Sequence, residues 1–524
     1  MKRRDFIKKS ALTGIALSAV PSAFNGFQIE ALAQSPSLKA MQALAGDSDR
    51  VMVLIQLQGG NDGLNTVIPY EDAKYYAARP TIGIKKVEAL KLNDTLGWHP
   101  SMPDFKNLFD SEKMALVQGV TYPNPDRSHF RGSDIWLTAT DSNVFLGTGW
   151  AGRYLETLAP ANPDELPPDP LAIQIGNNLS LGFQSGRGSL GVTFKDPDEF
   201  YKLVGESETP ADEDLTPDTP YGNELDFIRG VEKSAQVYSK RIKAAGDSAQ
   251  NKVTYPTGND LAEKLKIVAR LIAGGLQTKF YLVAIERNAF DTHAAQGGVT
   301  GAHANLLQQL STATKAFMDD AEMLGIDERV AGMTFSEFGR RVTENGSEGT
   351  DHGTAAPMFV FGKNVIGGQV HGANPDLANL DKQGDLLMQN DYRQVYASAL
   401  TQWFGAPQTD IQKILLKQFN TLPLFKPSGP NAIVEDHEIL LKVGNYPNPF
   451  TEATTIQYTL PAAAYVNLTI TDIRGNVISR LYSGDQNAGP HTIPFNAKSL
   501  SAGTYFYKLE AGRYSALHPM QLVR

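Results

Sequence analysis

The chain has 524 residues, of which 41% are hydrophobic and 20% are charged. This composition is typical of a globular protein and excludes a fibrous or disordered chain, and the length predicts two or three domains. The formal net charge is −9 and no basic run is interleaved with aromatic residues, so we expect no nucleic-acid partner. Because cysteine is absent, any metal site must be built from His, Asp, Glu and hydroxyl side chains.

The first 33 residues have the features of a targeting segment. The pair Arg3-Arg4 precedes a mild apolar stretch over residues 11–24, and the small-residue site Ala31-Leu32-Ala33 follows. We therefore predict a twin-arginine signal peptide over residues 1–33, which makes the twin-arginine machinery a partner and the periplasm a stage of export. A plain N-terminal anchor is the alternative. No later segment is long and apolar enough to span a bilayer, so the mature chain is expected to have no transmembrane segment.

The C-terminal part reads as a separate small domain. Pro and Gly residues predict a linker over 426–443. Beyond it, residues 444–524 show short alternating runs separated by turn signals, which predicts a small all-β immunoglobulin-like sandwich. The expected strands cover residues 454–460, 465–472, 477–482, 491–495 and 503–510.

Three motifs make this domain more specific: Asn-Tyr-Pro-Asn-Pro-Phe at 445–450, Leu-Thr-Ile-Thr-Asp-Ile-Arg-Gly-Asn-Val at 468–477, and Ala-Gly-Thr-Tyr at 502–505. Together they resemble the type A sorting domain of the type IX secretion system. The resemblance implies the type IX export machinery as a partner and an extracellular or outer-membrane-surface destination. The alternative is a carbohydrate-binding or adhesive sandwich.

The middle of the chain alternates strand-like and helix-like segments. Buried strands are predicted at 51–57, 281–285 and 330–335, and amphipathic helices at 259–275 and 302–324. This alternation predicts an α/β domain with a mostly parallel sheet. In such sheets ligands bind beyond the carboxyl ends of the strands, and here all three strands end in polar, ionisable loops.

These loops hold most of the candidate site residues. Asp62 lies in a glycine-flanked turn after the first strand, although Asn-Asp-Gly is also a common turn sequence. Ser128 and His129 follow a strand-like run at 115–120, and a lone Ser-His pair often only caps a helix. Asp291-x-His293, with His303 further on, combines carboxylate and imidazole in the way that zinc-like or manganese-like ions require.

Two further candidates come late in the domain. Glu337 precedes Phe338-Gly339-Arg340, and Asp351-His352 lies between Thr350 and Gly353. A histidine beside a loop glycine is more often exposed and functional than a histidine on a helix face.

The ordered set of motifs resembles the alkaline phosphatase and sulfatase superfamily. The closer resemblance is to the domain-of-unknown-function fifteen-oh-one family, through the segments 59–65, 127–130, 149–153, 290–293, 336–340 and 350–353. It covers nearly all of residues 50–425 and implies an alkaline phosphatase-like three-layer α/β/α domain.

The resemblance also implies roles for single residues. Ser128 would be the nucleophile, and Arg340 would hold a non-bridging substrate oxygen. The implied ligands of divalent metal are Asp62, Asp291, His293, Glu337, Asp351 and His352, with Zn, Mn, Mg or Ca as candidates. Phe338 stands where the superfamily has a metal-binding histidine, so we expect a lopsided metal site.

Three functions are considered on these expectations. The first is an exported metal-dependent hydrolase of phosphate or sulfate esters, in which metal activates Ser128 for attack. The second is a non-catalytic surface or secreted protein that keeps the fold and binds a glycan or a partner protein. The third hypothesis is a serine hydrolase that uses Ser128, but the sequence has no Gly-x-Ser-x-Gly motif to support it.

Overall fold

The computed structural model describes residues 49–160, 166–205, 220–426, 443–460, 464–472, 477–511 and 514–524. The predicted twin-arginine signal and nearly all of the predicted linker lie outside these residues. We describe the α/β domain and the C-terminal sandwich each by itself. Among the described residues, no helix combines the length and hydropathy needed to cross a bilayer.

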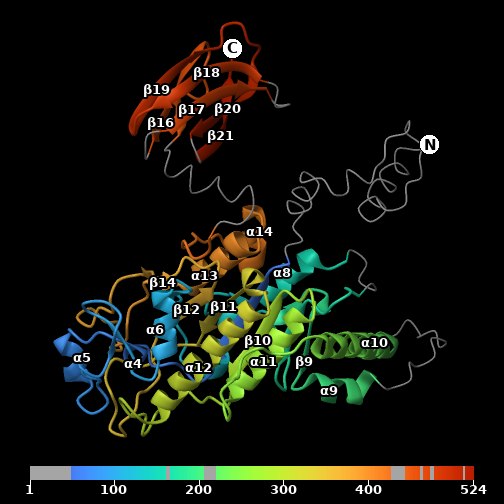
Figure 1. The fold of residues 1–524 in the computed structure, drawn as a ribbon, viewed down its shortest axis with the longest axis vertical. Helices are drawn as coiled ribbons and strands as arrows, with labels where there is room; N and C mark the ends of the chain where they lie inside the picture. The colour runs from blue at the N-terminus through green and yellow to red at the C-terminus, as the bar shows by residue number, and fades with distance from the viewer. Residues whose placement is uncertain are drawn as a thin grey trace. The chain divides into compact units, whose positions relative to one another are not determined.

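A nine-stranded sheet forms the centre of the α/β domain (Figure 1). Most strands run parallel, and β12 is antiparallel to both of its neighbours. The order across the sheet is β13 (Val370–His371), β5 (Met114–Thr121), β12 (Ala356–Gly362), β11 (Val330–Phe335), β1 (Val51–Leu57), β10 (Phe280–Ile285), β6 (Ala172–Ile175) and β9 (Gly191–Phe194), with β14 (Asn390–Asp391) also paired to β5.

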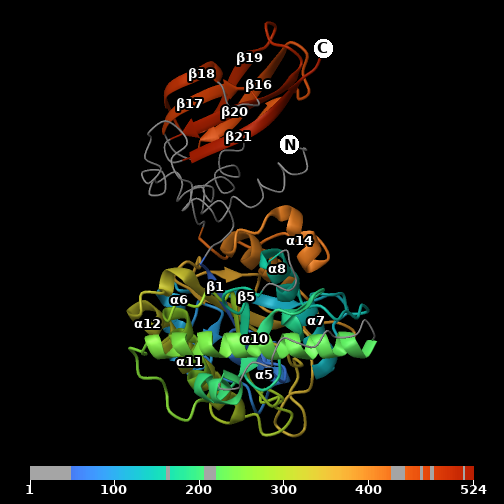
Figure 2. The ribbon, with the colours of Figure 1, turned by 90° about the vertical axis from the view of Figure 1, so that its right-hand side faces the viewer.

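Helices cover both faces of this sheet, which makes three layers (Figure 2). Alternate side chains of a strand point to opposite faces, so Val53 of β1 joins one core while Leu54 joins the other. The first core is covered by α6 (Pro103–Asp110), α10 (Pro220–Ser248), α11 (Asp260–Ala273) and α12 (Ala302–Met323). The second is covered by α7 (His129–Thr138), α8 (Trp150–Leu158), α13 (Tyr392–Ser398) and α14 (Gln408–Leu415).

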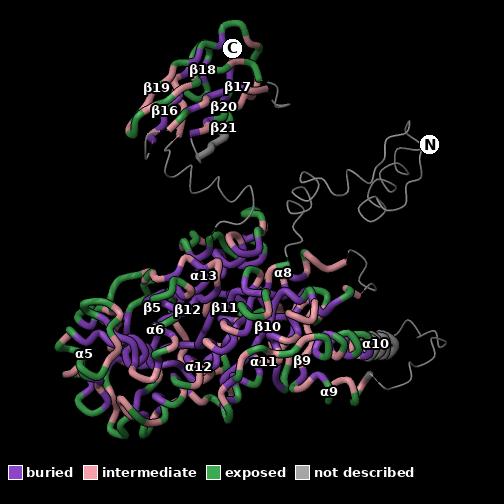
Figure 3. Tube along the Cα trace, viewed as in Figure 1, coloured by how far each residue is buried: buried purple, intermediate pink, exposed green. Residues whose placement is uncertain are grey.

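The layers are built from strongly apolar segments. Every residue of β1, β10, β11 and β12 is buried, as expected for strands sandwiched between helices (Figure 3). Helix α11 begins where the Asn259 side chain accepts a hydrogen bond from the Ala262 N–H, and it ends at Gly274. The predicted helices at 259–275 and 302–324 are confirmed within one or two residues at each end.

Shorter elements lie between the main strands and helices. They are α4 (Gly63–Thr66), α5 (Ala73–Ala78), α9 (Pro197–Phe200), β2 (Val67–Ile68), β3 (Leu90–Lys91), β4 (Gly97–Trp98), β7 (Gln184–Ser185), β8 (Gly188–Ser189), two 3₁₀ turns at Leu181–Phe183 and Asp327–Arg329, and two π-helical turns at Tyr201–Gly205 and Ala399–Trp403.

The C-terminal domain is a sandwich of two antiparallel sheets that share one core. One sheet has β15 (Gly444–Tyr446), β16 (Ala453–Leu460) and β19 (Gly489–Asn496), and the other has β18 (Val477–Gln486), β17 (Ala464–Thr471), β20 (Gly503–Ala511) and β21 (Tyr514–Leu522). Ile456 from the first sheet and Leu468 from the second are both fully buried in that core. The predicted fold class is confirmed for both domains. The strands β15 and β21 were not predicted.

Candidate metal centre

The site lies at the carboxyl edge of the large sheet. There β1 ends at Leu57, β10 at Ile285 and β11 at Phe335, and the loops that follow carry Asp291 and Glu337. Gly59 makes the loops' close approach possible, because a Cβ on it would lie 2.3 Å from the Asp291 backbone nitrogen. Its φ of +116° is also one that favours glycine.

Asp291 is the centre of the cluster. Its Oδ1 lies 3.0 Å from His293 Nε2 and 3.1 Å from His352 Nε2, and it accepts a 2.6 Å hydrogen bond from Arg340 Nη2. Burial raises the pKa of Asp291, but the neighbouring Arg340 and His352 side chains outweigh burial and hold that pKa below its ordinary value. The carboxylate is therefore ionised at neutral pH.

A third histidine reaches the same carboxylate from α7. His129 Nε2 lies 3.5 Å from Asp291 Oδ2, and one ligand atom each of His129, Asp291 and His352 lie within 4.8 Å of one another. His129 Nδ1 lies 2.8 Å from Glu337 Oε1, and this hydrogen bond raises the pKa of His129. Three imidazole rings thus surround one aspartate.

All three rings present Nε2 to Asp291 and direct Nδ1 to an oxygen acceptor. The Nδ1 acceptors are Glu337 Oε1 for His129, Asp351 Oδ1 at 3.1 Å for His293, and the Arg127 carbonyl at 2.8 Å for His352. A carbonyl or carboxylate can only accept, so each Nδ1 carries a proton, which leaves Nε2 as the ring atom that can bind a cation. This is the outer-shell pattern typical of metal-binding histidines.

The geometry fits a divalent cation. The triangle of Asp291 Oδ1, His293 Nε2 and His352 Nε2 has sides of 2.9, 3.0 and 3.1 Å. Neighbouring octahedral ligands about 2.1 Å from a cation lie about 3 Å apart. Two further buried atoms have no hydrogen-bond partner, namely His129 Nε2 and Glu337 Oε2. Imidazole with carboxylate is a donor set suited to Zn²⁺ or Mn²⁺.

Glu337 and Asp351, both expected as ligands, contact histidines instead. Glu337 is buried, and its Oε1 also accepts from the Gly59 N–H. Asp351 Oδ1 also accepts from Asn345 Nδ2, and that hydrogen bond is the main cause of its lowered pKa. In this structure both carboxylates orient rings, and Glu337 keeps a buried oxygen, Oε2, that has no hydrogen-bond partner.

Asp62 is placed differently from the expectation that it binds metal. Both of its oxygens accept from Arg79, at 2.6 and 2.8 Å, and Oδ2 also accepts from Gln296. Asp62 and Arg79 are completely buried. The guanidinium therefore occupies the position that a cation would need.

Arg340 also differs from its expected role of holding a substrate oxygen. Its side chain is fully buried and donates to the Gly60, Thr350 and Phe290 carbonyls at 2.7 to 3.0 Å, as well as to Asp291. The guanidinium is surrounded by these acceptors, so it stabilises the loops of the site and is not presented to solvent.

Ser128 is exposed beside the cluster. It is the N-cap of α7, where its Oγ accepts a long 3.4 Å hydrogen bond from the Arg131 N–H, and His129 is the first residue of the helix. Within the described part of the chain, no base is hydrogen-bonded to the Ser128 hydroxyl. The Phe338 ring packs 5.0 Å from His129 and 4.6 Å from His352, measured between ring centroids.

The sequence interpretation missed His129 as a ligand candidate. The only signal in the sequence was its place after Ser128 in a loop that follows a strand. The orientation of its ring depends on a hydrogen bond to Glu337, which lies 208 residues away in the chain. His303 was considered with the Asp291 pair, but it is fully buried on α12 and bonds Asn61 instead.

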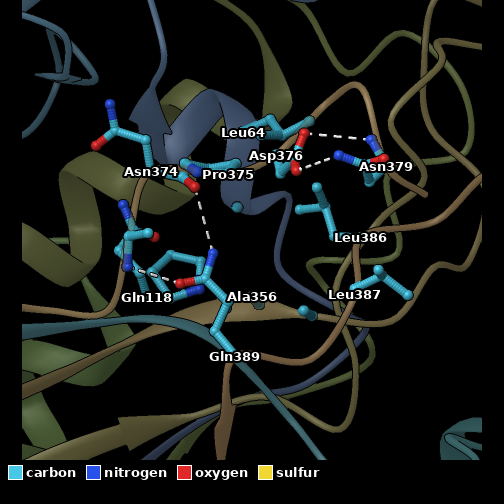
Figure 4. A pocket seen from close by; sticks show the side chains of 15 residues that line it. Leu64, Gln118, Ala356, Asn374, Pro375, Asp376, Asn379, Leu386, Leu387 and Gln389 are labelled. Carbon is cyan, nitrogen blue, oxygen red and sulfur yellow. Dashed lines mark hydrogen bonds between the residues drawn. The ribbon is translucent and has the colours of Figure 1, made fainter. Parts of the chain in front are cut away.

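A separate cavity of about 300 Å³ lies between α4, the end of β5 and the loop that precedes β14 (Figure 4). Leu64, Leu386 and Leu387 line it together with the amides of Asn374 and Gln389. None of the three clustered histidines lines this cavity.

Fold and side chains together define an α/β protein with a candidate His/Asp metal centre at the edge of its sheet, followed by a β-sandwich. Residues 239–415 match the family model described as "Protein of unknown function (DUF1501)", and residues 445–520 match the "Secretion system C-terminal sorting domain". The resemblances to these two families are therefore confirmed over the matched residues. The sorting domain indicates secretion to the cell surface or the extracellular space.

Comparison with curated proteins gives no match. Among solved structures, the PsFucS1 sulfatase from Pseudoalteromonas sp. is 12% identical, with 89% of this chain and 88% of that chain covered and a TM-score of 0.33. A protein in the alkaline phosphatase superfamily from Vibrio parahaemolyticus is 10% identical, with 91% and 83% covered and a TM-score of 0.33. The phosphonate monoester hydrolase SpPMH from Silicibacter pomeroyi is 8% identical, with 90% and 88% covered and a TM-score of 0.28.

Proposed function

We propose that the chain is an exported, metal-dependent hydrolase of phosphate or sulfate esters. His129, Asp291, His293 and His352 are the proposed ligands, and Glu337 and Asp351 orient the rings. The observation that carries the proposal is the convergence of three Nε2 atoms on one aspartate, with every Nδ1 already engaged by an oxygen acceptor.

A divalent cation, when bound, supplies Lewis-acid polarisation of the ester. Residues of the chain carry out the remaining steps. Ser128 Oγ forms the bond to phosphorus or sulfur while the bond to the alcohol oxygen breaks, and water then cleaves the seryl ester and restores the hydroxyl. Ser128 stands at the positive end of the α7 dipole, which favours its ionised form, and its exposure lets the proton pass to solvent.

A non-catalytic binding protein is the second candidate, and two observations favour it. Arg79 donates to both oxygens of Asp62, so Asp62 is not available for a second cation. The Arg340 guanidinium already donates to acceptors in the loops, so it is not available for a substrate oxygen. Export also fits this role. On either view we propose that the chain passes through the periplasm by a twin-arginine signal before type IX secretion.

Ester hydrolysis by the metal-loaded chain tests the enzyme proposal. The full chain is supplied with Zn²⁺ or Mn²⁺ and assayed on aryl phosphates and aryl sulfates, beside Ser128→Ala and a chelated sample. We expect turnover that both chelation and Ser128→Ala abolish, while Ser128→Ala retains metal. Metal binding without turnover of any ester would favour the binding protein.

A further inference from the structure

Two phenylalanines beside the candidate site are almost fully exposed. Phe130 is 86% exposed and Phe145 is 77% exposed, and Val144 and Leu146 beside Phe145 are also open to solvent. We call these four residues the aromatic rim. Apolar side chains gathered on a surface usually mark a place where something binds.

The rim begins next to the site. Phe130 follows His129, so their Cα atoms are about 3.8 Å apart. The inner face of α7 is fixed by Gly132, which packs against Glu337, and by Trp136, whose Nε1 donates to the Glu337 carbonyl at 3.0 Å. Two residues turn a helix by about 200°, so Phe130 lies away from the face that Gly132 buries and is presented to solvent.

The part of the rim formed by residues 144–146 contacts the first turn of α7 through Arg131. The Arg131 guanidinium carbon lies 3.9 Å from the centroid of the Phe145 ring. Arg131 also donates to the Ser142 carbonyl at 3.0 Å and to the Val144 carbonyl at 2.5 Å. Phe145 is therefore held near the start of α7 by its contact with the Arg131 cation, while its ring stays exposed.

We propose that the aromatic rim is a subsite for the alcohol part of the ester, and that the protein acts on esters of aromatic or extended apolar alcohols. This inference rests on the proposed function. The anionic group of the substrate faces the His/Asp cluster and Ser128, so its alcohol part extends toward solvent. Phe130, the residue directly after His129, is then the first apolar surface that it meets.

Two non-hydrolysable probes test this without turnover. Phenylphosphonate and methylphosphonate are titrated by calorimetry into the full chain loaded with Mn²⁺, and into Phe130→Ala, Phe145→Ala and Phe130→Leu. The control is Val87→Ala, which shortens an apolar side chain that is 90% exposed and lies outside the rim. If the phenyl ring stacks on the rim, wild type should bind phenylphosphonate about 3- to 10-fold more tightly than methylphosphonate.

We expect Phe130→Ala to reduce this preference at least 3-fold, Phe130→Leu to restore part of it, and Val87→Ala to leave it unchanged. Methylphosphonate affinity should stay within 2-fold in every variant. Equal binding of both probes to wild type would overturn the subsite alone, whereas no binding of either would remove the proposed ester site as well. Concentration-dependent association that Phe130→Ala abolishes would instead assign the rim to contact with a second copy of the chain.

Discussion

The Nε2 atoms of His293 and His352 lie 2.9 Å apart, although the residues are 59 positions apart in the chain. Both rings use Nδ1 as a donor, to the Asp351 carboxylate and to the Arg127 carbonyl. Two neutral rings would therefore direct lone pairs at each other. A proton on one ring or a cation shared by both removes this repulsion, and the Asp291 carboxylate beside them favours either positive charge.

Glu337 should tune metal affinity through His129. Changing Glu337→Gln removes the charge that holds the His129 ring, so we expect metal affinity to fall about 10- to 100-fold, as for other outer-shell partners of metal-binding histidines. The matched control is Glu322→Gln, since Glu322 pairs with Lys113 on the surface. Calorimetric titration with Zn²⁺ measures both variants. An unchanged affinity in Glu337→Gln, with an unchanged unfolding midpoint, would contradict this role.

Asp62 should act in stability and not in metal binding. Arg79→Met leaves the Asp62 carboxylate buried without its partner, which should lower the free energy of unfolding by about 3–5 kcal/mol. Adding Asp62→Asn to Arg79→Met should recover part of that loss. Urea unfolding measures the stability of each variant. Asp62→Asn alone should keep the metal content of wild type, and loss of metal in that variant would return Asp62 to the ligand set.

His303 should make the protein less stable as the pH falls. Burial lowers the pKa of His303 to about 3, against an ordinary value of 6.5. Below pH 6.5 the unfolded chain binds a proton at this histidine that the folded chain does not, so stability is full above pH 6.5 and is lost as the pH falls toward 3. The largest slope from one such group is about 1.4 kcal/mol per pH unit.

The check is urea unfolding of wild type and His303→Gln at several pH values between 7 and 4.5. We expect a shallower dependence of the unfolding free energy on pH in His303→Gln. Parallel curves for the two proteins would show that His303 does not titrate in this way. His491→Gln is a suitable control, because His491 is only half-buried and belongs to the sandwich.

The sandwich should be removable. Its core is formed by its own strands, with Ile456, Leu468 and Leu509 fully buried together. A chain that ends at residue 426 should therefore keep the main thermal unfolding transition of the full chain, because that transition belongs to the α/β domain. A large fall in the midpoint would show that the α/β domain depends on the C-terminal residues.

The sequence predicted the sheet, its main helices and the edge at which polar loops meet, because these follow from apolar periodicity. It did not predict the partner of Asp62, since Arg79 lies 17 residues away at the end of the short helix α5 and no sequence pattern links the two residues. The orientation of the His129 ring could not be predicted from the sequence either, because it depends on a hydrogen bond to Glu337, which follows a different strand. Strand β21 was missed because His518 and Pro519 interrupt its β-forming residues.

Metal content of the purified chain tests the central claim most directly. The full chain is loaded with Zn²⁺ or Mn²⁺, passed through a desalting column and analysed for metal, beside His352→Ala and the control His99→Ala, whose buried ring bonds the Gly298 carbonyl outside the cluster. We expect one ion per chain in wild type and His99→Ala, and at least a 10-fold loss in His352→Ala. No bound ion in wild type, or an equal content in His352→Ala, would contradict the metal centre.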